Sequence, residues 1–199
     1  MEPIQGNVSI DAQNIMPIIK KWLYSDKDIF IREVVSNGCD AITKLRMVDS
    51  AAAQNCSIHV EVDKAARELR FTDDGIGMTE DEVKTNINQV AFSGAKSFME
   101  EYAKNEDKEN SGIIGHFGLG FYSVFMIADK VTIDTLSFRE GATPVRWESE
   151  DGMAFTMTEG TRTTRGTTIT LHVSEAESEF LEQWRVREVL DRYCSFMSV

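Results

Sequence analysis

Cysteine is scarce in this 199-residue sequence. The three that occur, Cys39, Cys56 and Cys194, are widely spaced and form no Cys-x-x-Cys pair. An odd number of isolated cysteines predicts neither a disulfide framework nor a structural zinc site. We therefore expect a protein of a reducing compartment, with the cytoplasm as the default location.

The sequence also lacks a long apolar run and an excess of positive charge. No stretch is long enough to span a bilayer, and the N-terminus lacks the basic and then apolar pattern of a signal peptide. There are 21 Lys and Arg residues against 33 Asp and Glu, giving a formal net charge of -12. Because such a chain repels polyanions, we expect neither nucleic acid nor membrane as a partner.

The remaining composition is that of one globular domain, with 42% hydrophobic and 27% charged residues. Alternating polarity predicts strands at 57–63, 68–73, 130–138, 145–149, 154–157 and 167–173. Helical periodicity predicts helices at 11–23, 26–46, 122–128 and 175–196. The capping-box spacing of Thr79 and Glu82 predicts a further short helix after Thr79. We expect an α+β fold of two layers, with helices on one face of a twisted sheet that is mixed and mostly antiparallel.

One predicted helix carries chemical groups at intervals of three and four residues, which places them on one face. These positions are Glu33, Asn37, Asp40 or Ala41, and Lys44. A carboxamide such as that of Asn37 suits a hard Mg²⁺ ion, and Glu33 one turn away suits a water beside the metal. A solvated helix face with ordinary charge pairs is the alternative.

The run Asp73-Asp74-Gly75-Ile76-Gly77-Met78 follows a predicted strand directly. Its glycines allow a sharp turn and a close approach to a flat ligand. Asp73 can then accept a hydrogen bond from an amino group such as that of adenine, and Thr167 can share a water with it if their strands are neighbours. A tight turn with a solvated aspartate explains the same letters.

Glycines punctuate residues 93–120, which predicts a mobile segment. The run Gly115-His116-Phe117-Gly118-Leu119-Gly120-Phe121 then leads into a predicted helix. Glycine amides followed by a helix N-terminus supply the N–H donors that a triphosphate needs in an acidic protein. A glycine-rich linker is the alternative, since the spacing matches neither the P-loop nor the dinucleotide fingerprint.

Four motifs occur in one order: ExxxNxxDA at 33–41, DxGxG at 73–77, GxxGxG at 115–120 and GT at 166–167. Together they resemble the Bergerat-type nucleotide-binding fold shared by gyrase, heat-shock chaperones, histidine kinases and MutL. The strings YSDKDIFIREVVSN, DDGIGMT, GHFGLGFYSVFMIAD and RGTTITLHV look most like the 90-kDa heat-shock chaperones, above all the bacterial ones. The resemblance covers essentially the whole chain.

The resemblance implies a role for each matching position. Glu33 would orient the hydrolytic water, Asn37 would bind Mg²⁺, and Asp73 would bind adenine, with Thr167 and Gly77 completing a water-linked network. The other ATP-binding positions would be Asp40, Ala41, Met78, Asn86, Ile87, Ser93, Gly94, Gly115, His116, Phe117, Gly118, Leu119, Gly120 and Phe121. Residues 93–120 would form a lid over the nucleotide.

The same resemblance implies a larger assembly. Residues 1–199 would be a single N-terminal ATP-binding domain, with middle and C-terminal domains beyond Val199, in a homodimeric stress-response chaperone that acts on unfolded client proteins. A catalytic arginine would come from the middle domain, so this chain should bind ATP and ADP better than it hydrolyses ATP.

One departure stands out, because Phe92 occupies the position of a phosphate-side lysine in many relatives, which puts nucleotide affinity or lid geometry in doubt. The alternatives are a histidine-kinase-type ATP-binding domain and a non-catalytic interaction domain.

Overall fold

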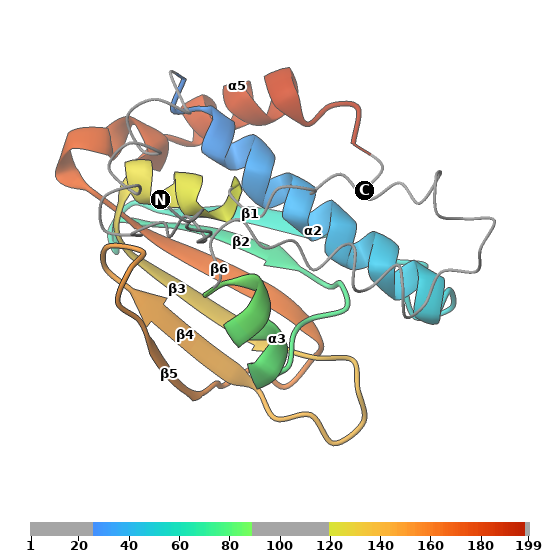
Figure 1. The fold of residues 1–199 in the computed structure, drawn as a ribbon. Coiled ribbons are helices and arrows are strands. Elements are labelled where there is room, and N and C mark those ends of the chain that lie inside the picture. The colour runs from blue at the N-terminus through green and yellow to red at the C-terminus, as the bar shows by residue number, and fades with distance from the viewer. Residues whose placement is uncertain (1–25, 89–119, 198–199) are drawn as a thin grey trace, which may run out of the picture.

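The computed structural model describes residues 26–88 and 120–197. The strands form one sheet in the order β1-β2-β6-β3-β4-β5 (Figure 1). They are β1 (Ile58–Asp63), β2 (Glu68–Asp73), β3 (Ala128–Leu136), β4 (Val145–Ser149), β5 (Thr156–Glu159) and β6 (Gly166–Val173). The α+β fold is confirmed, and the sheet, expected to be mixed and mostly antiparallel, is antiparallel at every pairing among these strands.

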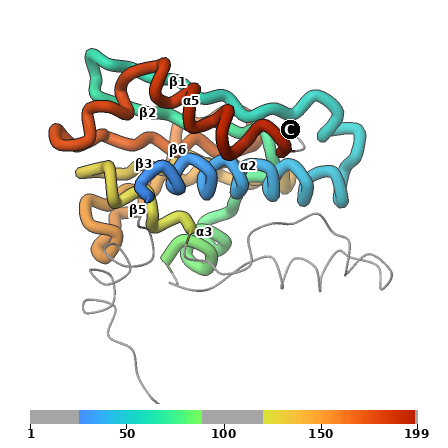
Figure 2. Tube along the Cα trace, turned by 90° about the horizontal axis from the view of Figure 1, so that it is seen from above, coloured from blue at the N-terminus to red at the C-terminus, as the bar shows by residue number. Residues whose placement is uncertain are grey.

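Helical segments cover one face of the sheet. They are α2 (Ile29–Val48), α3 (Glu80–Asn86), the 3-10 helices η2 (Gly120–Met126) and η3 (Glu175–Leu181), and α5 (Gln183–Tyr193). Helix α2 contacts β1 and β2, η2 contacts β3, and η3 contacts β2 and β6. Figure 2 shows α5 alongside α2, which it contacts. Within the described ranges, no helix has the length and apolar character that crossing a membrane requires.

Two predicted helices differ from the observed elements. The helix expected at 122–128 is the 3-10 helix η2, and Ala128 already belongs to β3. The helix expected at 175–196 is divided into η3 and α5 by Glu182, whose backbone is extended. This break lets η3 bury Phe180 and Leu181 while α5 turns a different apolar stripe to the core. The helix expected at 11–23 lies outside the described residues.

Strand β2 shows how the buried face is chosen. Leu69, Phe71 and Asp73 are buried, while the residues between them are only partly buried. Because side chains alternate across a strand, these three residues point toward the helices. Asp73, the last residue of the strand, therefore places a carboxyl group on the apolar face of the sheet.

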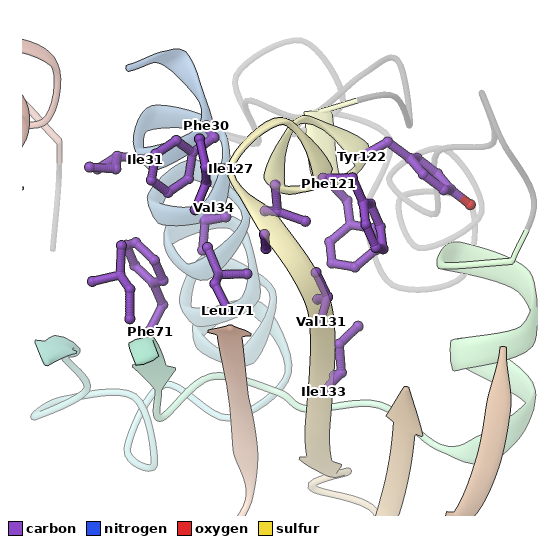
Figure 3. Close-up of a cluster of buried hydrophobic side chains, with 14 of the residues drawn as sticks. Phe30, Ile31, Val34, Phe71, Phe121, Tyr122, Ile127, Val131, Ile133 and Leu171 are labelled. Carbon is purple, nitrogen blue, oxygen red and sulfur yellow. The ribbon is translucent and has the colours of Figure 1, made fainter. Parts of the chain in front are cut away.

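Aromatic rings join the helical layer to the sheet (Figure 3). Phe30 of α2 is fully buried and lies edge-on to Phe71 of β2, with ring centroids 6.4 Å apart. It makes a second edge-to-face contact with Phe180 of η3, at 5.1 Å. Phe30 thus fixes α2 over the strand that carries Asp73.

We expect Phe30→Ala to lower the free energy of unfolding by about 3 to 5 kcal/mol, because it removes a fully buried ring and leaves a cavity. Urea denaturation followed by circular dichroism measures this loss. Phe196→Ala is the matched control, since Phe196 is 99% exposed and a surface substitution of this kind costs less than about 0.5 kcal/mol. Equal unfolding midpoints for the two variants would contradict the role assigned to Phe30.

Candidate functional site

Three polar side chains form a row across the sheet, on its buried face. Asp73 of β2 pairs with Thr167 of β6, and Thr167 pairs with Thr135 of β3. Residues paired in antiparallel strands point to the same face, and the three are only 8%, 6% and 0% exposed. The condition for a water shared by Thr167 and Asp73, that their strands are neighbours, is therefore met.

The Asp73 carboxyl group is held by backbone donors. Its Oδ1 accepts a hydrogen bond from the Gly75 N–H at 2.9 Å, and the backbone N–H of Thr167 also lowers the pKa of this carboxyl. Burial raises the pKa of Asp73 to about 7, and these donors and the nearby Arg162 guanidinium only partly oppose that effect. Near neutral pH the group is therefore balanced between an ionised acceptor and a neutral acid.

The loop after Asp73 is attached on both sides. Ile76 N–H donates to the Ala41 carbonyl of α2 at 3.1 Å, and its own carbonyl accepts from Phe138 N–H at 2.9 Å. Gly77 has a φ of +65°, and a Cβ there would lie 1.9 Å from the Leu136 carbonyl oxygen. Only glycine fits this turn, which agrees with the tight turn predicted from the sequence.

Thr135 was missed by the sequence reasoning. Its Oγ1 accepts a hydrogen bond from the Met78 N–H at 3.0 Å and lies 3.0 Å from Thr167 Oγ1. The Gly166 carbonyl oxygen, at 3.2 Å, is within reach as an acceptor for the same hydroxyl. A threonine within an apolar strand gives no sign of these contacts, because they depend on the pairing of β3 with β6.

Helix α2 lies directly against Asp73 and its loop. A Cβ on Gly38 would be 3.5 Å from the Cβ of Asp73, and one on Gly75 would be 2.7 Å from Ala41. Asn37, which precedes Gly38, is half-buried, and Asp40 is buried. The alternative of a fully solvated helix face is therefore wrong for this part of α2.

Glu33 lies two helical turns before Ala41, about 12 Å along the axis. A Cβ on Gly120, the first residue of η2, would be only 2.2 Å from Glu33 Oε2. Arg32 Nη2 donates to the other oxygen, Oε1, at 2.6 Å. The Glu33 carboxylate therefore has one oxygen toward the Arg32 guanidinium and the other toward Gly120. Arg32 is not among the residues predicted from the sequence.

Other predicted positions lie in or beside the hydrophobic core. Ile87 and Phe121 are buried, and Met78 packs against the core. Asn86, the last residue of α3, is half-buried. The Tyr122 hydroxyl of η2 donates to the Ile87 carbonyl, which joins this edge of the site to η2. Ser93, Gly94, Gly115, His116, Phe117, Gly118 and Leu119 lie outside the described residues.

Lys44 continues the polar face beyond Ala41. Burial lowers the pKa of Lys44, and the negative charges of Asp40 and Glu82 oppose that shift. The capping box predicted at Thr79 and Glu82 is present at the start of α3. The capping box places Glu82 near Lys44, at the far end of the α2 polar face. The positive charge of Lys44 there partly offsets the negative charges of Asp40 and Glu82.

A metal would find few protein ligands here. Among residues 26–88 and 120–197, no group of three or more His, Cys, Asp or Glu side chains has the geometry to hold an ion. Asn37 offers a carboxamide oxygen on the face that joins Asp73 to Glu33. Mg²⁺ commonly takes one or two protein ligands and completes its shell with phosphate oxygens and water, so the residues present fit Mg²⁺ bound together with a nucleotide.

Comparison with known proteins relates the chain to a family. A sequence model of the family described as histidine kinase-, DNA gyrase B- and HSP90-like ATPase matches residues 29–151. The chain is 44% identical over 200 residues to the chaperone protein HtpG of Porphyromonas gingivalis, covering 98% of this chain and 29% of the relative. It is 46% identical over 200 residues to HtpG of Bacteroides thetaiotaomicron, with 98% and 28% covered.

A third relative, HtpG of Cupriavidus taiwanensis, is 40% identical over 196 residues, covering 95% of this chain and 31% of the relative. The chain thus spans about three tenths of the length of these relatives. The family match covers more than half of the chain, including α2, the Asp73 loop and η2. The chain therefore belongs to the histidine kinase-, DNA gyrase B- and HSP90-like ATPase family and is related within it to the HtpG chaperones.

Proposed function

We propose that this chain is the ATP-binding domain of an HtpG-like chaperone and that it binds ATP and ADP, with Mg²⁺, between α2 and the sheet. The observation that supports this most directly is the buried Asp73 carboxyl, aligned with Thr167 and adjoining the α2 face that carries Asn37 and Glu33. A buried acid beside Ala41, with an amide about 6 Å and a carboxylate about 12 Å farther along the same helix, suits the two ends of a purine nucleotide.

The purine end is assigned to Asp73. When ionised, its carboxylate accepts a hydrogen bond from the exocyclic amine of adenine, and such charge-assisted bonds are the stronger ones in buried sites. Thr167 and Gly77 then complete a water-linked network around the base. Met78, Ile87 and Phe121 supply apolar contact surface, with Asn86 near the ribose.

The phosphate end is assigned to the other half of α2. Asn37 holds Mg²⁺, which neutralises phosphate charge, and Glu33 orients and deprotonates the attacking water. The phosphate contacts expected from the backbone amides of residues 115–121, and the lid expected at 93–120, fall almost entirely outside the described residues. In a chain with a net charge of -12, these local donors and the metal must overcome the overall repulsion of a polyanion.

The full-length protein is proposed to be a homodimeric, cytoplasmic stress-response chaperone that hydrolyses ATP and acts on unfolded client proteins. Residues 1–199 form its single nucleotide-binding domain, followed by middle and C-terminal domains. An arginine from the middle domain completes the catalytic site, and the absence of one such group costs ~10³ in rate. This chain alone is therefore expected to turn over ATP very slowly.

Transfer of phosphate to a histidine has less support. His59 is an exposed residue of β1, and His172 lies 3.5 Å from Glu68 on the sheet. Neither of these described histidines is on a helix, whereas a receiver histidine usually lies on a dimerisation helix. The relatives named HtpG also favour the chaperone over the kinase.

Asp73→Asn should weaken ADP binding by roughly 10- to 100-fold, because the amine of the base loses a charged acceptor in a buried site. Isothermal titration of ADP with Mg²⁺ measures the affinity. Asp74→Asn is the matched control, since Asp74 is the adjacent, partly exposed carboxylate. Equal ADP affinity for Asp73→Asn and wild type would remove the adenine assignment.

The affinity for adenosine should rise about tenfold from about pH 6 to about pH 8. With a pKa of about 7, Asp73 is mostly protonated at the lower pH and mostly ionised at the higher one, and only the ionised form accepts from the amine. Adenosine is the probe because the phosphates of ADP titrate in the same range. An affinity independent of pH would contradict the ionised acceptor.

The stability of the unliganded protein gives an independent check on the same group. Because the folded state holds the Asp73 proton up to about pH 7, whereas an unfolded aspartate releases it near pH 4, this residue makes stability fall as pH rises between those values. Asp73→Asn should lack that contribution.

Glu33→Ala should retain ADP binding within about threefold and abolish ATP hydrolysis by the full-length protein, because Glu33 is assigned to the water rather than to the nucleotide. Titration and a steady-state ATPase assay separate the two effects. Glu80→Ala, at an exposed residue of α3, is the control for lost charge. Unchanged hydrolysis in Glu33→Ala would exclude the catalytic role.

A further inference from the structure

We propose that Thr135 is a positioning residue for purine recognition: it fixes the direction of the Thr167 hydroxyl and the place of the Gly77–Met78 turn. The inference rests on the proposed nucleotide function and adds a residue that none of the four sequence motifs contains. Thr135 itself is fully buried in β3, so it acts through these neighbours.

The hydrogen bonds of Thr135 can be counted. A hydroxyl has one hydrogen to donate and two lone pairs to accept with. The Met78 N–H, at 3.0 Å, uses one lone pair of Thr135 Oγ1. The Gly166 carbonyl at 3.2 Å can only accept, whereas Thr167 Oγ1 at 3.0 Å can donate or accept.

This count limits what Thr167 can offer to a ligand. If Thr135 donates to the Gly166 carbonyl, Thr167 must donate its own hydrogen to Thr135, and Thr167 then offers only lone pairs. If Thr135 donates to Thr167 instead, the Thr167 hydrogen is free for the ligand or its water. In both cases Thr135 removes the free rotation of the Thr167 hydroxyl. A fixed arrangement of hydrogen-bond donor and acceptor therefore lies beside Asp73.

The second contact acts on the loop. The Met78 N–H has Thr135 Oγ1 as its acceptor, and it follows Gly77, whose turn is already constrained by the nearby Leu136 carbonyl. Without the hydroxyl this donor loses its partner, and an unsatisfied donor in a protected site is costly. The turn would then shift away from the position that the base requires.

The test uses Thr135→Val, which keeps the shape of the side chain but removes the hydroxyl. We expect ADP affinity to fall about tenfold. We also expect the preference for ADP over inosine diphosphate to narrow, because the base of the latter exchanges donor and acceptor at its Watson–Crick edge and a freely rotating Thr167 hydroxyl can serve either. Thr135→Ser, which retains the hydroxyl, should restore both the affinity and the preference.

Thr132→Val is the matched control. Thr132 is on the same strand and only 2% exposed, but it is on the other face of the sheet. Its Oγ1 has no hydrogen-bond partner among the described residues. Removing that hydroxyl should leave the affinities for ADP and inosine diphosphate unchanged. Urea denaturation of all variants without nucleotide shows whether a loss of affinity reflects a general loss of stability.

Wild-type affinity and an unchanged ADP preference in Thr135→Val would overturn the inference while leaving the proposed function in place. An equal loss in Thr135→Ser and Thr135→Val would also overturn it, because the hydroxyl would not be the cause. If wild type bound no ADP, the proposed function would fall together with this inference. Should Thr135→Val fail to fold, Thr135→Cys, whose thiol is a weaker hydrogen-bonding group, should give a smaller change in the same direction.

Discussion

The site depends on a carboxyl group buried at the end of a strand and held there by backbone N–H groups. Asp73 follows Leu69 and Phe71 on the face that packs beneath α2, so its position is set by the same alternation that builds the core. The N–H group of Gly75 keeps the acid oriented, while burial raises its pKa to about 7. The result is an acid whose ionisation is sensitive to the groups around it.

Close contacts between backbone and side chains determine how the two layers meet at this point. Gly38 and Gly75 leave no space between α2 and the Asp73 loop, and Ile76 N–H donates to the Ala41 carbonyl. The edge-to-face contacts of Phe30 with Phe71 and Phe180 also hold the same helix over the same strand. Packing and hydrogen bonding therefore agree on a single position for α2, and the groups on its polar face are positioned relative to Asp73 as a consequence.

Much of this arrangement was predicted from the sequence, because it follows from local patterns. The alternation at 68–73 gave β2 with its observed bounds, Thr79 and Glu82 gave the capping box, and the spacing of Glu33 and Asn37 gave one face of one helix. The contributions of Thr135 and Arg32 were not predicted. Both arise from contacts that the local pattern does not encode: a hydroxyl across a strand pairing, and an ion pair between adjacent residues whose rotamers depend on the packed helix.

The contact between Gly120 and Glu33 limits which residue can stand at position 120 if the Glu33 carboxylate is to keep its place. A methyl group at position 120 would have to occupy the space of Glu33 Oε2. Even the smallest enlargement there would therefore turn the carboxylate away from its place rather than disturb the hydrophobic core. Because Gly120 has no side chain, the start of η2 leaves the space that the Glu33 carboxylate of α2 occupies, although the two residues are far apart in the chain.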